Sequence, residues 1–404
     1  MISKKIFVEK NQILPEKRIL EVKNLAVYFR NKEGLIRAVR NVNLSINEGQ
    51  IVGLVGESGS GKSVTLKSLI GFNDNDITES NRIQYKNINL KKVKKGQWTN
   101  IRGTQIGYIP QDPLTSLNPL KQIKHQIFES YRVSKKNQKK WDDFENKNNF
   151  KKGLIKENDF KNKKSEIRTK YYKDINKVVM KKKVYDILKF IGITNIKHNW
   201  NLYPHEFSGG MRQRIVIAMS IIAEPKLIIA DEPTTALDVT VQAKVIDLIK
   251  SLSKKYNIAV IFISHNIGLV ANLCEFIYVM YAGKIVEQGK TWEIFTNPRH
   301  PYTWALISSI PDSGLSDDLV SIPGSPPSMI MPPKGDAFAP RNEYALEIDF
   351  KKQPPMFQIT KSHKAATWLL HPESPNIPIP DIVVKKLLNA ADAVAFKKGQ
   401  FNGK

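Results

Sequence analysis

The sequence predicts an α/β fold with a parallel sheet at its core, and three observations support this prediction. Apolar runs without polar alternation occupy residues 50–56, 226–230 and 258–264, as in strands that are covered on both faces. Residues 239–254 carry apolar side chains at steps of three and four, which predicts a helix between the last two runs. A glycine-rich sequence, residues 56–63, directly follows the first run. Strands and helices that alternate in this way are typical of a parallel sheet.

Along the chain, residues 18–56 predict three strands. The first two, ILEVKNLAVYF and LIRAVRNVNLSI, alternate with a period of two, whereas the third is continuously apolar. A short helix is expected from Lys62 onward, and the later runs QIGYIP and KLIIA again suit covered strands. After Asn297 the chain becomes rich in proline, which predicts an extension of loops and short strands over residues 297–404.

The composition fits a folded protein in a reducing compartment. The chain has 404 residues, 41% of them hydrophobic, and a net charge of +25, and its length suggests two or three domain-sized units. Its one cysteine, Cys274, excludes an internal disulfide framework and a cysteine-rich metal site. No apolar stretch reaches the ~18 residues of a membrane-spanning helix, and no secretory signal is visible. We therefore expect the chain to stay in the cytoplasm.

The glycine-rich sequence predicts a phosphate-binding loop. Residues 56–63, GESGSGKS, fit the pattern G-x-x-x-x-G-K-[ST] between a predicted strand and a predicted helix. The glycines let backbone N–H groups converge on phosphate oxygens, and the helix N-terminus adds partial positive charge. Lys62 is expected to reach the β- and γ-phosphates, and Ser63 to ligate Mg²⁺. In this context a chance glycine-rich turn is the weaker interpretation.

Two carboxylates end an apolar strand later in the chain. Leu227–Ala230 is followed by Asp231 and Glu232, and ligands bind at the carboxyl ends of parallel strands. We expect Asp231 to hold Mg²⁺, often through water, and Glu232 to polarise the attacking water. The alternative, an ordinary polar end of a strand, loses weight because a phosphate-binding loop occurs in the same chain.

A strongly basic segment, residues 132–182, interrupts the α/β pattern. It holds 18 Lys plus Arg against 7 Asp plus Glu, a net charge of +11, with many Asn and little apolar periodicity. This composition favours a solvated, mobile insertion. The alternative hypothesis is a positive arm that is attracted to an anionic membrane face or to nucleic acid.

Further motifs make the sequence similar to the ATP-binding cassette (ABC) ATPases. Residues 205–214, HEFSGGMRQR, resemble the signature motif of that family. Gln111 resembles the Q-loop, Ala236-Leu237-Asp238 the D-loop and His265 the H-loop, all in the family's order. The resemblance covers about residues 18–288. It implies a P-loop ATPase with a RecA-like parallel sheet core, an antiparallel β subdomain and an α-helical signature subdomain, followed by the C-terminal extension.

The resemblance also implies which residues form the ATP site. The implied catalytic residues are Glu232, His265, Gln111 and Asp238. The implied Mg²⁺ ligands are Ser63, Gln111 and Asp231. The adenine is expected to stack on Phe29, or less favourably on Tyr28. The remaining implied contacts to ATP are Gly56, Ser58, Gly59, Ser60, Gly61, Lys62, Ser63, Val64, Ser208, Gly209 and Gly210.

The signature motif implies a dimer. Ser208 and the amides of Gly209 and Gly210 precede a helix expected to start near Met211, and such a helix terminus suits a γ-phosphate. In the family this motif faces the P-loop of the opposite subunit, so that two ATP molecules are buried between two cassettes. Hydrolysis then lets the dimer open.

Within the family, the resemblance narrows to the D-type ATPases of oligopeptide and dipeptide importers. The tail HPYTWALISSIP followed by IPGSPP is the most discriminating part. It implies a cassette over residues 18–296, whose helical subdomain spans about 112–225 and carries the basic insertion, and an importer-type extension over 297–404. The implied partners are a second, non-identical ATPase, two membrane permeases and an extracytoplasmic peptide-binding protein. The implied location is the cytoplasmic face of the cell membrane, as a peripheral subunit.

In many of these importers the tail holds an iron–sulfur cluster by four cysteines. The matching places in this chain are Asp336, Asn342, Asp349 and Thr367. Because all four thiols are missing, the sequence predicts no iron–sulfur cluster.

Other functions are weaker hypotheses. Dipeptide and nickel importers share the tail and stay open as alternatives. A soluble ABC ATPase acting on ribosomes or nucleic acid would suit the charge of +25, but the chain has one P-loop, one signature and the importer tail. We therefore expect no specific nucleic acid partner. A degenerate cassette is disfavoured because Lys62, Asp231 and Glu232 are all present.

Overall fold

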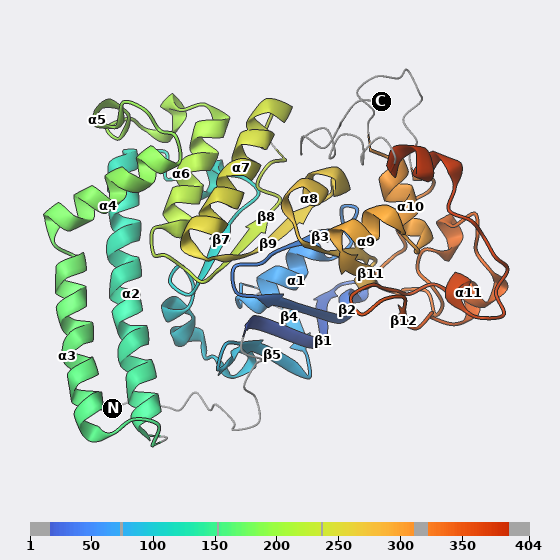
Figure 1. The fold of residues 1–404 in the computed structure, drawn as a ribbon, viewed down its shortest axis with the longest axis horizontal. Coiled ribbons are helices and arrows are strands. Elements are labelled where there is room, and N and C mark those ends of the chain that lie inside the picture. Colours follow the sequence, from blue (N-terminus) through green and yellow to red (C-terminus); the bar gives the residue numbers. More distant parts are fainter. Residues whose placement is uncertain (1–16, 73–75, 152, 236, 311–321, 388–404) are drawn as a thin grey trace, which may run out of the picture. The chain divides into compact units, whose positions relative to one another are not determined.

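The computed structural model describes residues 17–72, 76–151, 153–235, 237–310 and 322–387 (Figure 1). The described residues form two compact units. The first contains residues 47–50 and 90–261, and the second contains residues 17–46, 51–89 and 262–387. Among the described helices, none combines the length and the apolar character needed to cross a membrane.

The first unit joins parallel strands to a set of helices. Strands β7 and β8 pair in parallel, with Ile106 opposite Leu227 and Ile109 opposite Ala230, and β9, which begins in this unit, follows β8 in the strand order. The strands are β7 (Ile106–Ile109), β8 (Leu227–Asp231) and β9 (Ala259–Ser264). The helices are α2 (Ile123–Lys151), α3 (Glu157–Asp174), α4 (Lys177–Phe190), α5 (Ile196–Asn199), α6 (Gly209–Ile221) and α7 (Val239–Tyr256). The strands and the helix predicted for this part are confirmed, and α7 extends two residues beyond its predicted end.

The core of the helical part forms where α2, α4 and α6 bring their apolar faces together. Ile127 of α2, Val184 of α4 and Ala218 of α6 belong to one buried cluster. Phe207, which directly precedes the signature serine, is buried in the same cluster. The apolar core therefore fixes where the signature motif lies within this unit.

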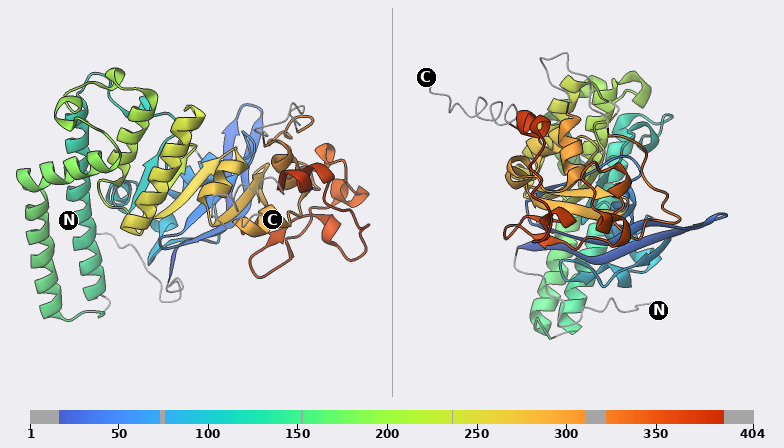
Figure 2. Two further views of the ribbon diagram at one scale, coloured as in Figure 1. Left: turned by 45° about the horizontal axis from the view of Figure 1, so that its top comes forward. Right: turned by 90° about the vertical axis from the view of Figure 1, so that its right-hand side faces the viewer.

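The basic segment forms a helical hairpin made by α2 and α3, which lie side by side in Figures 1 and 2. Phe150 and Phe160 stack near the turn, with ring centroids 4.7 Å apart, and Trp141 of α2 is buried. No residue of α3 is buried, as expected of a solvated segment. The part of α2 within the basic segment differs from that expectation, because it buries Ser134, Lys135, Trp141 and Asn146. The regular helices were not predicted, because lysine, glutamate and glutamine favour helices without leaving a strong apolar pattern.

The second unit holds an antiparallel sheet and part of a second sheet. The antiparallel sheet has the order β2-β1-β5-β6, with β4 paired to β1, and the other strands of the unit follow the order β12-β13-β11-β10-β3. Strands β3 and β10 are parallel. The strands are β1 (Arg18–Asn31), β2 (Gly34–Asn47), β3 (Ile51–Val55), β4 (Asp76–Glu79), β5 (Arg82–Tyr85), β6 (Ile88–Asn89), β10 (Phe276–Tyr281) and β11 (Lys284–Lys290). The three predicted strands are confirmed as β1 to β3.

The C-terminal extension belongs to the second unit and contains helices as well as loops and short strands. Its β13 pairs with β11. Its helices include α10 (Pro301–Ser308), the 3₁₀ helix η5 (Ala339–Arg341) and α11 (Glu347–Lys351). The other elements of this unit are α1 (Lys62–Leu69), α8 (Ile267–Leu273), α9 (Thr291–Thr296), β12 (Phe357–Gln358), β13 (Lys364–Ala365) and the 3₁₀ helix η6 (Trp368–Leu370).

Candidate functional site

The phosphate-binding loop lies in the second unit, between β3 and α1. Two of its glycines leave no room for a side chain: a Cβ on Gly56 would collide with the carbonyl of Met280, and a Cβ on Gly61 with the carbonyl of Ala38. Gly61 also has a φ of 97°, a backbone conformation that glycine adopts without steric cost. The predicted helix start at Lys62 is confirmed. The loop therefore has the strand–loop–helix context that phosphate binding requires.

Lys62 is buried within this loop. Its side chain is 4% exposed, and Nζ donates hydrogen bonds to the carbonyls of Gly56 and Glu57, both at 2.8 Å. Ser60 is equally buried, and its Oγ has no hydrogen-bond partner among the described residues. A buried hydroxyl without a partner is costly, and an anion held by the loop would supply one. Ser58 and Gly59 are exposed, and Ser63 and Val64 are half-buried at the start of α1.

The strand β8 ends in the predicted carboxylates, in the first unit. Asp231 is 3% exposed, and Tyr108 of β7 donates a hydrogen bond from its hydroxyl to Asp231 Oδ2 at 2.8 Å. Burial, followed by the charge of Asp231, raises the pKa of Tyr108, so the phenol keeps its proton and remains a donor. Tyr108 was not among the residues predicted from the sequence. The available signal was a lone tyrosine in an otherwise aliphatic strand next to β8.

Glu232 adopts an unusual backbone conformation. Its φ is 47°, and a non-glycine residue in this region costs of order 1 kcal/mol or more. Its carboxylate accepts a hydrogen bond from Thr235 Oγ1 at 2.9 Å. Backbone strain of this kind occurs preferentially at functional sites, which is consistent with the predicted role of this glutamate.

Gln111 lies near these carboxylates in the strand register. Ile109 and Ala230 are paired in the parallel strands β7 and β8, and both strands end at the same edge of the sheet. Gln111 follows Ile109 by two residues and is exposed, as Glu232 follows Ala230 by two residues. The structure thus brings Gln111, Asp231 and Glu232 to one edge of the first unit.

The signature helix α6 begins at Gly209, two residues before the predicted start at Met211. Ser208 is its N-cap, and its Oγ accepts a hydrogen bond from the Met211 amide at 3.3 Å. Gly209 and Gly210 therefore form the first turn, where backbone N–H groups have no partner within the helix. A Cβ on Gly210 would collide with Val241 of α7, so only glycine fits here.

The other predicted residues occupy surface positions. Asp238 is the N-cap of α7 and accepts a hydrogen bond from the Val241 amide at 2.8 Å, a local structural role that the sequence did not predict. Ala236 of the predicted D-loop lies outside the described residues. His265 is exposed directly after β9, and Phe29 and Tyr28 are half-buried in β1. His265, Phe29 and the phosphate-binding loop belong to the second unit, whereas Asp238 and the signature belong to the first.

The four places that carry cysteines in resembling importers are occupied by oxygen acceptors. Each side chain accepts a hydrogen bond from a nearby backbone amide. The bonds are Phe338 N to Asp336 Oδ1 at 3.2 Å, Tyr344 N to Asn342 Oδ1 at 3.0 Å, Leu346 N to Asp349 Oδ2 at 2.8 Å and Leu369 N to Thr367 Oγ1 at 3.3 Å. Within the described part of the chain, no group of three or more His, Cys, Asp and Glu side chains is arranged to hold a metal ion. These residues therefore do not fit an iron–sulfur cluster, whose ligands are thiolates.

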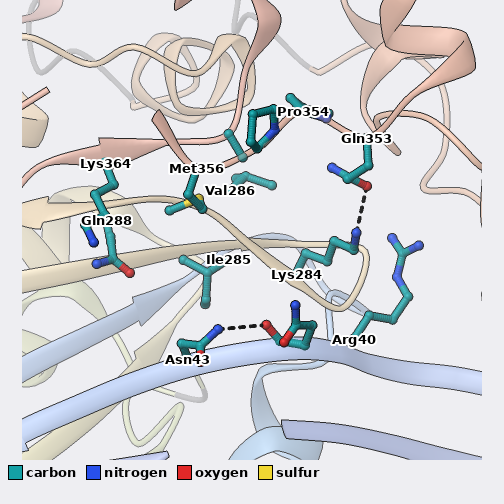
Figure 3. Close-up of a pocket in the computed structure, with 13 residues that line it drawn as sticks. Arg40, Asn43, Lys284, Ile285, Val286, Gln288, Gln353, Pro354, Met356 and Lys364 are labelled. Atoms are coloured by element: carbon teal, nitrogen blue, oxygen red, sulfur yellow. Dashed lines mark hydrogen bonds between the residues drawn. The ribbon is translucent and has the colours of Figure 1, made fainter. Parts of the chain in front are cut away.

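A separate cavity of about 400 Å³ lies in the second unit, between β2, β11 and the extension (Figure 3). Lys284 Nζ donates a hydrogen bond to Gln353 Oε1 at 2.8 Å. Burial, followed by the charge of Arg40, lowers the pKa of Lys284 to about 8. Arg40 donates two hydrogen bonds to the carbonyl of Ala282. Three cationic side chains line the cavity, Arg40, Lys284 and Lys364. Because Arg40 and Lys284 are already engaged within the chain, the cavity does not indicate a class of ligand.

Comparisons with known proteins agree with these features. The family model described as ABC transporter matches residues 39–235, and the model described as oligopeptide/dipeptide transporter, C-terminal region, matches residues 286–348. The chain is 53% identical to the oligopeptide transport ATP-binding protein OppD of Mycoplasma genitalium, over 97% of this chain and 98% of that protein. It is 42% identical to OppD of Bacillus subtilis, over 93% and 95% of the two chains. It is also 42% identical to the dipeptide transport ATP-binding protein DppD of Lactococcus lactis, over 92% and 97%.

Among solved structures, the chain resembles a dimeric bacterial ABC transporter cassette. The TM-score is 0.52 at 23% identity, and the match covers 68% of this chain and 99% of the cassette. At this level the similarity supports the cassette fold of the chain.

Proposed function

Since the chain belongs to the ABC transporter ATPases of the oligopeptide and dipeptide type, we propose that it hydrolyses ATP to power the import of oligopeptides through partner membrane permeases. The observation that carries the proposal is the 53% identity to an oligopeptide transport ATP-binding protein over 97% of the chain. This match includes the extension, which a generic cassette would not need.

In the proposed ATP site, the phosphate-binding loop holds the triphosphate. Lys62 lies ready to exchange its two carbonyl partners for phosphate oxygens, and the unpartnered Ser60 Oγ is available as a donor. The half-buried Phe29 is proposed to stack on the adenine. Mg²⁺ usually takes one or two protein ligands and keeps several waters, and Ser63, Gln111 and Asp231 are the residues proposed to hold it. When bound, the ion would offset negative charge on the β- and γ-phosphates.

For hydrolysis, we assign Glu232 to orient and polarise the attacking water. General base catalysis of this kind contributes about 10²- to 10⁴-fold to rates. Gln111 and His265 are proposed to complete the catalytic site. Asp238 is assigned to the site by the family motif, in addition to its N-cap hydrogen bond.

The signature is proposed to act on the ATP of a second cassette. The backbone N–H groups in the first turn of α6 lie at the helix N-terminus, and this positive end of the helix attracts anions. Ser208, Gly209 and Gly210 would then contact a γ-phosphate held by the partner's loop. The proposed assembly contains a second, non-identical ATPase, two permeases and an extracytoplasmic peptide-binding protein, with this chain at the cytoplasmic face of the membrane.

A dipeptide substrate is the second candidate. It is favoured by the 42% identity to a dipeptide transport ATP-binding protein over 92% of the chain. The choice between the two substrates depends on other subunits, because the cassette does not contact the transported peptide in this proposal.

The proposal is tested by purifying the tagged Glu232→Gln protein from detergent-solubilised membranes with ATP present, and identifying the bound proteins by mass spectrometry. Two permeases and a second cassette are the expected result. The identity of the permeases then indicates which substrate to assay. The tagged Lys62→Ala protein is the matched control, since it should retain permeases and lose most of the ATP-dependent cassette pairing. Recovery of ribosomal proteins or nucleic acid in place of permeases would refute the transport function.

A further inference from the structure

Glu57, the second residue of the phosphate-binding loop, is held on two sides by the C-terminal extension. Its backbone amide donates a hydrogen bond to the hydroxyl of Tyr302 in α10 at 2.7 Å. Its carboxylate accepts two hydrogen bonds from Arg341 in η5, from Nη1 to Oε2 at 2.6 Å and from Nη2 to Oε1 at 3.0 Å. Its carbonyl accepts a hydrogen bond from Lys62 Nζ. One residue thus connects the extension to the phosphate-binding lysine, and all four residues lie in the second unit.

Arg341 is built into the extension with little freedom. Its side chain is 5% exposed, and its remaining hydrogen bonds go to the carbonyls of Pro323 and Ile322 and to the hydroxyl of Tyr281. A bidentate pair of this kind fixes geometry as well as charge. The Glu57 side chain is 25% exposed, so only the guanidinium of the pair is fully buried. Removing Glu57 would leave that buried charge uncompensated, and removing Arg341 would leave the Glu57 carboxylate unpaired, so the two residues depend on each other.

An aromatic cluster made of Tyr281, Tyr302 and Phe338 supports the arrangement. The ring centroids are 4.6 Å apart between Tyr281 and Tyr302, and 5.3 Å apart between Phe338 and each tyrosine. The guanidinium carbon of Arg341 lies 5.8 Å from the ring centre of Tyr281. Packed rings allow few alternative positions, so the cluster keeps both Arg341 and Tyr302 aimed at the loop.

We propose that Arg341 and Tyr302 are positioning residues for ATP binding: through Glu57, the C-terminal extension holds the phosphate-binding loop in its receptive shape. The inference rests on the ATP site proposed above. Arg341 offsets the carboxylate charge that would otherwise repel the triphosphate, and Tyr302 holds the Glu57 amide in a defined direction. The extension therefore contributes to nucleotide affinity without touching the nucleotide.

The test measures the dissociation constant for a fluorescent ATP analogue, with full-length variants and their unfolding temperatures. Arg341→Met is expected to weaken binding about 10-fold, because it leaves Glu57 charged beside the phosphates and the loop less fixed. Tyr302→Phe deletes one hydroxyl and is expected to weaken binding about 3-fold, since it removes a single hydrogen bond. Tyr302→Phe changes the side-chain volume little, so this variant is expected to fold. Gln353→Ala is the matched control, because it removes a contact of the extension to Lys284 and is expected to leave the dissociation constant unchanged.

A double variant separates positioning from general destabilisation. Adding Glu57→Gln to Arg341→Met removes the uncompensated charge, and it is expected to recover at least half of the lost binding free energy even if the unfolding temperature stays low. Failure of this rescue, or an unchanged dissociation constant in both Arg341→Met and Tyr302→Phe, would overturn the inference. Lys62→Ala separates a failure of the proposed ATP site from a failure of the positioning role of the extension. If Lys62→Ala leaves binding unchanged, the proposed ATP site itself is wrong; if it abolishes binding while the extension variants have no effect, only the positioning role is wrong.

Discussion

The phosphate-binding loop and the helical hairpin α2–α3 are held in place in opposite ways. In the loop, backbone carbonyls exclude any Cβ at Gly56 and Gly61, and a buried lysine is bonded to the loop's own carbonyls. In the hairpin, α3 has no buried residue, and its charge is spread over an exposed surface. The difference indicates that several positions of the loop accept only the residue they have. Much of the hairpin surface, in contrast, can change without affecting the fold.

The largest expected effect concerns Glu232, whose backbone φ is 47°. Glu232→Gln should lower ATP turnover at least about 100-fold, because the water loses its base, while ATP binding stays within about 3-fold. Steady-state phosphate release and binding of the fluorescent analogue measure the two quantities. Unchanged turnover in the purified complex would remove Glu232 from its assigned role.

A smaller effect is expected from the hydrogen bond between Tyr108 and Asp231. Tyr108→Phe removes the donor and leaves the buried Asp231 less well oriented, so turnover should fall about 10-fold, in keeping with the loss of one charged hydrogen bond. The Mg²⁺ concentration for half-maximal turnover should rise in parallel. Tyr131→Phe is the matched control, since it deletes another tyrosine hydroxyl of the same unit, bonded to the carbonyl of Asp174. Equal losses in both variants would point to general destabilisation.

The reactivity of the Lys284 amine measures the contrast between a buried side chain of the second unit and the exposed side chains of α3. Burial lowers the pKa of Lys284 to about 8, from about 10.4 for an ordinary lysine. At pH 8, a larger fraction of the Lys284 amine is therefore neutral than of an ordinary lysine amine. Trace labelling with an amine-reactive reagent should therefore show a midpoint near pH 8 at Lys284, with the exposed Lys163 and Lys164 of α3 as internal references. Peptide mass spectrometry over pH 6.5 to 10 gives the profiles. A profile at Lys284 that follows the two references would show that its surroundings leave the amine unaltered.

The smallest effect is expected in the hairpin itself. The double variant Lys163→Gln, Lys164→Gln changes two exposed side chains, and surface substitutions usually alter the free energy of unfolding by less than about 0.5 kcal/mol each. Turnover and the midpoint of thermal unfolding should stay close to those of the parent protein. A clear loss of turnover would contradict the comparison, and weaker, salt-dependent binding to anionic liposomes would favour the membrane-arm hypothesis.

Local patterns predicted much of the fold and of the site. The strand–loop–helix context of residues 56–63 and the apolar strand before Asp231 depend on neighbouring residues, so they could be recognised directly. The start of α6 was placed two residues late, because the capping role of Ser208 was not considered.

Contacts between distant positions could not be predicted in this way. Arg341 and Glu57 are 284 residues apart, and Tyr108 and Asp231 are 123 residues apart. Neither pair leaves a periodic signal in the sequence. The hairpin was missed for a different reason: Tyr131, Trp141 and the stacked Phe150 and Phe160 are too widely spaced among lysines and asparagines to give a helical pattern.

The four oxygen acceptors at Asp336, Asn342, Asp349 and Thr367 have a consequence for the conditions under which this tail can fold. Their hydrogen bonds come from amides two or three residues away, so each turn is closed by the polypeptide alone. A tail held together by an iron–sulfur cluster would need a supply of iron and sulfide, and oxygen could damage the cluster. This tail should reach the same shape in iron-starved and in aerated cells, and the hold that it exerts on Glu57 would then be independent of metal nutrition.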